Sequence, residues 1–183
     1  IPRGEGRPPL PDMSLPPVFG GWRREVVEDD VMLPRLFMAF RSPAMGTKEY
    51  YAASVCGAAL GLRKGSRLHR VLVRERQVAS DASAFTYDLT KGADTLVVDV
   101  TARPEVSQAQ LEDEVATVID DIHRNGFTDA EVARAAALIE TELVAALQSV
   151  GDRADRLSMF TTYFEEPELV NAQADLYRAV TAA

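Results

Sequence analysis

The sequence has few histidines and cysteines, and their spacing does not match known catalytic or zinc-binding motifs. The 183 residues include two histidines and one cysteine. His69 lies in RLHRVL and His123 in DIHRNG, so neither belongs to an H-E-x-x-H or H-x-x-E-H zinc motif. A zinc site needs three or four ligands, and Cys56 lies in an apolar helical pattern. We therefore predict no metal ligand and no catalytic residue in this chain.

Motifs for other chemistries are missing as well. The sequence contains no G-x-S-x-G, no P-loop and no G-x-G-x-x-G. Three acidic pairs could hold a cation, but the spacing of a calcium loop does not accompany them. We interpret them as solvated surface: Asp29 with Asp30, Asp120 with Asp121, and Glu165 with Glu166.

The densest group of charges of one sign lies in GSRLHRVLVRERQVASDASAF, residues 65 to 85. Its arginines are Arg67, Arg70, Arg74 and Arg76. They fall partly on the helix face opposite an apolar stripe formed by Leu68, Val71 and Leu72. A solvated outward face explains them best, and a contact with a peptide or partner domain is the second interpretation. Nucleic acid is disfavoured because no aromatic residues alternate with the arginines.

The composition limits the possible partners. The net charge is −8 and the isoelectric point is about 4.8, which argues against non-specific binding of nucleic acid. No run approaches the roughly 20 apolar residues of a membrane span, and no signal-peptide pattern is found. The compartment, cytoplasmic or periplasmic, stays open.

The elements that would position these residues begin after a linker. Six prolines fall within residues 1–19, which predicts a semi-rigid tether from a preceding domain. A single folded domain is expected over residues 20–183.

Hydrophobic patterns then predict strands at about 22–32, 35–41, 78–88 and 95–103, with the last two forming an antiparallel hairpin around a turn at 89–94. Helices are predicted at about 47–60 and 66–76, and four more follow residue 106. Capping-box patterns at Ser107 and Thr128 mark the starts of the first two of these four. The expected fold class is α+β: an antiparallel sheet with helices packed against it.

Two stretches, RLFMAFRSPAMGTKEYYAASVCGAALG followed by SRLHRVLVRERQVASDASAF, resemble the non-catalytic repeat domain of pitrilysin/insulinase-type zinc metallopeptidases. Mitochondrial processing peptidase and many bacterial zinc proteases belong to that family. GFTDAEVARAAALIETELVAAL and RADRLSMFTTYFEEPE resemble the helical continuation of the same domain. The resemblance covers about residues 20–183.

The resemblance implies a curved antiparallel sheet with flanking helices, from which this chain lacks the family's last strand. It also implies a companion domain or subunit that carries H-x-x-E-H and holds zinc, while this chain holds no cofactor. The two halves would close around an unfolded peptide. By itself the chain would not hydrolyse peptides.

Two positions depart from the pattern of the substrate-side half of such enzymes. That half carries an arginine and, seven residues later, a tyrosine that help to hold the scissile region. The corresponding positions here are Val73 and Ser80. Neither side chain can supply a guanidinium or a phenol, which favours a supporting domain that does not act as this clamp.

Three functional hypotheses follow. The first is an inactive domain that helps to form the peptide-binding chamber of a zinc metalloprotease. The second is a non-peptidase assembly or interaction module derived from the same fold. The third is an independent enzyme whose site the sequence does not reveal.

Overall fold

The computed structural model describes residues 21–87 and 94–182. The described elements are β1 (Arg35–Arg41), α1 (Lys48–Gly61), η1 (His69–Glu75), β2 (Ala79–Tyr87), β3 (Thr95–Ala102), α2 (Gln108–Asn125), α3 (Asp129–Ala146), α4 (Val150–Met159), η2 (Phe160–Phe164) and α5 (Leu169–Arg178), where η marks a π-helical segment. The three strands form an antiparallel sheet in the order β1-β3-β2. The predicted α+β class is confirmed.

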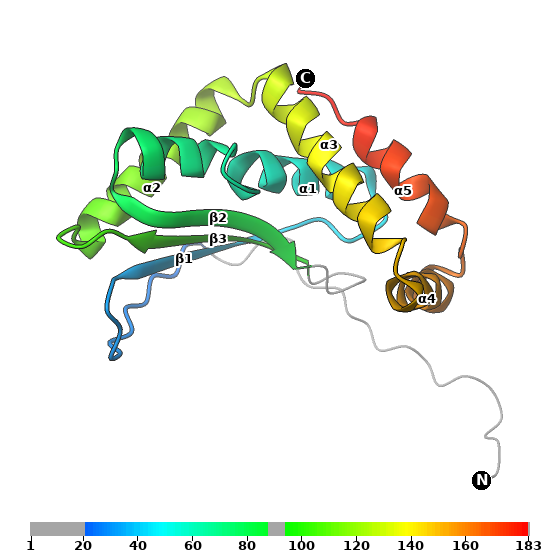
Figure 1. The fold of residues 1–183 in the computed structure, drawn as a ribbon. Coiled ribbons are helices and arrows are strands. Elements are labelled where there is room, and N and C mark those ends of the chain that lie inside the picture. The colour runs from blue at the N-terminus through cyan, green and yellow to red at the C-terminus, as the bar shows by residue number, and fades with distance from the viewer. Residues whose placement is uncertain (1–20, 88–93, 183) are drawn as a thin grey trace, which may run out of the picture.

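The two faces of the sheet differ. Val98 and Val100 of β3 are fully buried, whereas Val97 and Asp99 point to the opposite face and are partly exposed. Such alternation between the two faces is the ordinary geometry of a strand that is covered on one side. In Figure 1, α1, α2, α3 and α5 all lie on the side of the sheet to which the even-numbered residues of β3 point.

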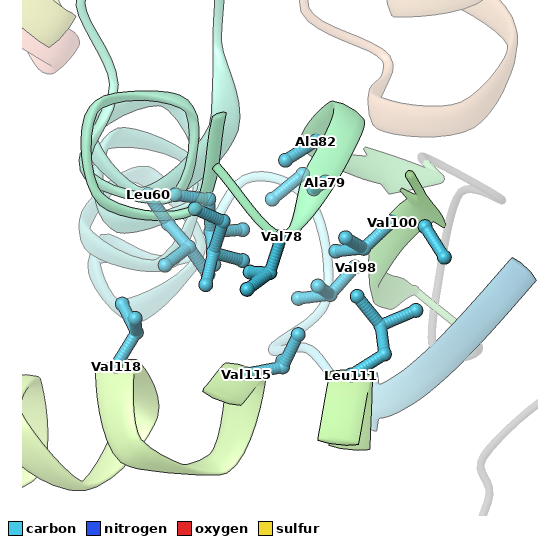
Figure 2. Packing of buried hydrophobic residues seen from close by; sticks show 13 residues of the cluster. Leu60, Val78, Ala79, Ala82, Val98, Val100, Leu111, Val115 and Val118 are labelled. Atoms are coloured by element: carbon cyan, nitrogen blue, oxygen red, sulfur yellow. The ribbon is translucent and has the colours of Figure 1, made fainter. Parts of the chain in front are cut away.

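The first layer of helices packs directly on the sheet. Figure 2 shows Leu60 of α1 and Val115 and Val118 of α2 converging on Val98 and Val100. The apolar stripe of the basic segment belongs to the same core, since Leu68 and Leu72 have no exposed surface. Removing these side chains from water is the main stabilising contribution to the domain.

A second core joins α1 to the outer layer formed by α3 and α5. Tyr50, Tyr51 and Val55 of α1 pack against Val132 of α3 and Tyr177 of α5, among others. The amide of Gln173 in α5 donates a hydrogen bond to the Tyr51 hydroxyl at 3.1 Å. Helix α1 is therefore the central layer between the sheet and α3 with α5 (Figure 1).

The predicted helix starts are confirmed at both capping positions. The Thr128 hydroxyl accepts from the Glu131 backbone N–H while the Glu131 carboxylate accepts from the Thr128 N–H, a complete capping box. Ser107 accepts from the Gln110 N–H at 3.2 Å, so this cap makes the first half of the box. Gly126 ends α2 with a φ of 70°, a backbone conformation that favours glycine.

The strand predicted at residues 22–32 is wrong. Residues 21–34 contain no strand, and nearly all their side chains are exposed. The acidic run Glu28–Asp30 has low strand propensity, and no described layer covers the valines beside it. The segment is tethered instead by Arg24, which donates twice to Glu112 of α2, and by Trp22, whose ring meets Phe40 edge-on at 5.3 Å.

The linker predicted at residues 1–19 and the turn predicted at 89–94 lie mostly or wholly outside the described residues. The domain boundary near residue 20 therefore stays a prediction. The hairpin on either side of the turn is confirmed, with β2 and β3 paired from Ala79–Ala102 to Tyr87–Thr95.

Candidate functional site

The basic segment folds as a short helix that widens to a π-helix. The Arg76 N–H donates to the Val71 carbonyl five residues earlier, at 2.8 Å. With this hydrogen-bond pattern, Leu68 and Leu72 face the sheet, and the chain continues directly into β2. The predicted apolar stripe is confirmed, and the segment leads directly into β2.

The outward orientation predicted for Arg67 is wrong. Its side chain is only 9% exposed, and its guanidinium donates to both carboxylate oxygens of Glu131 at 2.6 Å. A further N–H reaches Asp121 at 2.9 Å, and the guanidinium carbon lies 5.4 Å from the centre of the Phe127 ring. A buried carboxylate needs a counter-charge, and the sequence does not show that Glu131 faces this helix.

This ion pair changes the protonation of Glu131. The hydrogen bonds from Arg67 lower the pKa of Glu131 to about 2, although burial raises it. The hydrogen bonds from the Thr128 backbone and hydroxyl lower it further. Glu131 is therefore a carboxylate at neutral pH, and it connects the basic segment to the first turn of α3.

The remaining arginines are more exposed. The Arg70 guanidinium lies 3.3 Å from the Glu75 carboxylate and 3.8 Å from the Glu131 carboxylate. Arg76 forms an ion pair with Glu114 of α2. Arg74 is exposed and forms no ion pair with a residue that the structure describes. Most of the positive charge in this segment is thus neutralised locally. Contact of Arg70, Arg74 or Arg76 with a substrate or partner stays a prediction.

The positions that correspond to the family's clamp are Val73 and Ser80. Val73 is half-buried and packs against the core, and its carbonyl accepts from Arg103 at 3.3 Å. Ser80 is exposed at a β-bulge in β2, and its hydroxyl lies 3.2 Å from the Thr101 carbonyl and 3.1 Å from that of Ala102. Neither residue offers a cation or a free phenol in this place.

One residue near these positions could not be found from the sequence. The Arg103 guanidinium donates to the carbonyls of Ala79 and Val73, between η1 and the start of β2. It lies there because the hairpin register places Ala102 opposite Ala79. The contact follows from the pairing register of β2 and β3, and the sequence pattern does not give that register.

The residues that the structure describes do not form a zinc site. His123 lies exposed in the last turn of α2, whereas His69 lies in η1 with its Nδ1 buried. Within residues 21–87 and 94–182 no group of three potential ligands comes together. One member of the acidic pairs, Asp121, is already hydrogen-bonded to Arg67 and Asn125.

The face of the sheet that points away from the helices carries exposed aromatic residues. Phe37 of β1 is 60% exposed, and Phe85 and Tyr87 of β2 are also exposed, with their ring centres 5.2 Å apart. Arg35 donates to Asp99 at 2.8 Å and lies over the Phe37 ring at 4.9 Å. We call these five residues the aromatic face.

No described helix covers the aromatic face. The sequence pattern does not reveal this face, because Leu36 to Phe40 form a continuous apolar run that fits a strand covered on both sides. The register places the odd-numbered residues of β1 and β3 on the same side. Aromatic side chains that are exposed together on one face are a common feature of binding surfaces.

Comparison with known proteins shows one family. Residues 1–139 match the model described as the peptidase M16 inactive domain. The chain is 24% identical to the zinc protease PqqE of Helicobacter pylori over 161 residues, covering 88% of this chain and 35% of that protein. It is 29% identical to an uncharacterized zinc protease of Mycobacterium tuberculosis, covering 82% and 34%.

A solved structure has the same fold. The inactive peptidase domain of a predicted zinc protease from Bordetella parapertussis superposes with a TM-score of 0.70 at 18% identity, and the match covers 85% of each chain. At this identity the likeness establishes the fold alone.

The chain spans about a third of the length of the curated relatives it matches. None of the described helices combines the length and apolar character needed to cross a membrane.

Proposed function

Because this chain belongs to the family of peptidase M16 inactive domains, we propose that it forms one wall of a peptide-binding chamber in a zinc metalloprotease. A companion domain or subunit with the H-x-x-E-H motif supplies the zinc and the hydrolysis. This chain contributes surface and shape and does not cleave peptides by itself.

The observation that carries this proposal is the aromatic face. Phe37, Phe85 and Tyr87 present apolar rings on a surface that no described helix of the domain covers. An unfolded polypeptide exposes apolar side chains that such a surface can bind without requiring one sequence. The Arg35–Asp99 pair adds a polar border that can accept or donate hydrogen bonds.

The zinc belongs to the companion in this proposal. The relatives that resemble this chain are named zinc proteases and are about three times as long as the matched region. Their additional length can accommodate a catalytic domain. When bound there, zinc would polarise the scissile carbonyl and activate water, while the residues of this chain hold the peptide.

The test is reconstitution. The H-x-x-E-H domain encoded upstream of this segment or in a neighbouring gene is produced separately, and cleavage of an unfolded peptide is measured for each part and for the mixture. We expect cleavage only from the mixture. Peptide cleavage and stoichiometric zinc in this chain alone would disprove the proposal.

The wall itself is tested with Phe37→Asp and Tyr87→Asp. Charges on the aromatic face should raise KM for the peptide by about tenfold, the change expected from losing one well-buried apolar contact. Ala116→Asp places the same charge on the exposed side of α2 and should leave KM unchanged.

The second candidate is a non-peptidase assembly module, with which the absence of the clamp residues at Val73 and Ser80 is equally compatible. It predicts a stable complex with a partner that lacks H-x-x-E-H. If no such motif is encoded upstream or nearby, and the complex nevertheless forms, the assembly role replaces the peptidase role.

A further inference from the structure

The sequence contains two pairs of adjacent basic residues, Arg23 with Arg24 and Arg63 with Lys64. Serine proteases of the trypsin type bind a basic side chain in a pocket that holds a carboxylate, and they cleave the bond that follows it. Cleavage also depends on the burial and hydrogen bonding of the backbone around that bond. Because the two pairs have the same chemistry, their backbone surroundings decide which of them can be cut.

The first pair lies in an exposed stretch without secondary structure. Residues 21–32 are all exposed and contain no helix or strand. Within the part of the chain that the structure describes, residues 21–28 form no backbone–backbone hydrogen bond, and neither core cluster includes any of them. In Figure 1 the dark blue chain that leads into β1 is an irregular coil at the edge of the molecule. A protease can therefore bind this stretch while the domain stays folded.

The second pair lies in a tight connection between two buried anchors. Residues 62–66 join α1 to the helix that contains η1, and Leu60 on one side and Leu68 on the other belong to the core on the sheet. Arg63 has a φ of 61°, in the left-handed region, and its guanidinium donates to Glu142 at 2.7 Å. Extending this connection in a protease cleft would pull core residues out of place, so a cut here requires the domain to open.

The two arginines of the first pair differ in their contacts. Arg24 donates twice to the Glu112 carboxylate of α2, at 3.0 and 2.9 Å. Arg23 is exposed and forms no ion pair with a residue in the described ranges. The Arg23 side chain can therefore enter a specificity pocket directly, whereas Arg24 must first leave Glu112.

We propose that the peptide bond between Arg23 and Arg24 is a processing site for an arginine-specific serine protease. Water is added across this bond through an acyl intermediate on the serine of the protease, so that Arg23 gains a carboxylate and Arg24 gains an α-amino group. The product, residues 24–183, keeps both cores and the ion pair between Arg24 and Glu112. The inference is independent of the proposed function, because it concerns the separation of residues 1–23 from the domain.

The test is limited digestion of the 183-residue chain with trypsin, followed over time by mass spectrometry of the products. Two variants are compared with the unaltered chain: Arg23→Gln, and Arg63→Gln as the matched control from the second pair. We expect the cut after Arg23 to be at least about tenfold faster than any cut after Arg63 or Lys64, because only the latter require opening of the domain. Arg23→Gln should abolish the product 24–183, and Arg63→Gln should leave its rate of formation unchanged.

Two further measurements test the role of the surroundings. The product 24–183 should unfold at the same temperature as the intact chain by circular dichroism. Glu112→Ala should increase the share of cuts after Arg24, since that side chain is then free; an unchanged share overturns the selection of the bond by the ion pair. A first cut after Arg63 or Lys64, or a lower unfolding temperature of the product, overturns the processing site.

Discussion

At the scale of single residues, the most consequential contact is the ion pair between Arg67 and Glu131. Both side chains are only 9% exposed, and the guanidinium binds both carboxylate oxygens. Thr128 donates its backbone N–H and its hydroxyl to the same carboxylate. Each buried charge therefore has directed partners, which is the condition for tolerating it in a protein interior.

Removing one partner should destabilise the domain strongly. Arg67→Met leaves the Glu131 carboxylate buried without its counter-charge, which costs about 3–5 kcal/mol of the free energy of unfolding. Urea unfolding at pH 7 measures this loss. The double variant Arg67→Met with Glu131→Met should recover much of it, because no unpaired charge remains. A loss below about 1 kcal/mol in the single variant would contradict the assigned burial.

The same pair predicts a dependence on pH. The folded-state pKa of Glu131 is about 2, below its ordinary value of 4.5. Its stabilising contribution is therefore complete above pH 4.5 and is lost as the pH falls from 4.5 towards 2. The size is on the order of 3 kcal/mol. Urea unfolding of the unaltered chain and of Glu131→Gln at pH 6, 4 and 2.5 should show the difference between them shrinking across this window.

At the scale of elements, α1 is positioned by a close approach to β2. A Cβ added to Gly61 would lie 1.8 Å from the Ala84 backbone nitrogen, so only glycine fits at the last residue of α1. The sequence predicts this glycine as a helix stop. Its role in the structure is to let the helix end touch the strand.

Substitution at this contact should be costly. Gly61→Ala forces α1 and β2 apart and should lower the free energy of unfolding by about 3 kcal/mol or more. Gly151→Ala is the matched control, because a Cβ there meets only Ser149 Oγ at 3.8 Å within α4. That change should be neutral or stabilise by up to about 1 kcal/mol. Thermal unfolding of the two variants compares them directly.

At the scale of the whole molecule, α1 lies between the sheet and the outer helices α3 and α5. The aromatic face lies on the side of the sheet that points away from these helices. The buried cores that stabilise the domain therefore lie on one side of the sheet, and the exposed aromatic side chains lie on the other. The net charge of −8 makes polyanions poor partners.

Metal removal should leave the domain unchanged. The described residues bring together no group of three potential ligands, so a chelator should not shift the unfolding temperature of the purified chain. Calorimetry with and without EDTA measures this. A drop of several degrees on chelation would reveal a structural metal.

The sequence predicted those parts of the fold that depend on local patterns. The hairpin of β2 and β3 and the capping box at Thr128 follow from alternation and from spacing within four residues. The burial of Arg67 does not follow from such patterns, because Glu131 is 64 positions away in the chain. Residues 22–32 are exposed because no described layer covers them. Strand propensity alone does not show whether such a layer exists.

The separation of Arg67 from Glu131 also has a kinetic consequence. Because this contact joins residues 64 positions apart in the chain, we expect it to form after the folding transition state. Weakening the pair should then accelerate unfolding and leave the folding rate nearly unchanged. Stopped-flow chevrons of Arg67→Met would show this as a raised unfolding limb. The ion pair would accordingly set how long the domain stays folded, more than how quickly it folds.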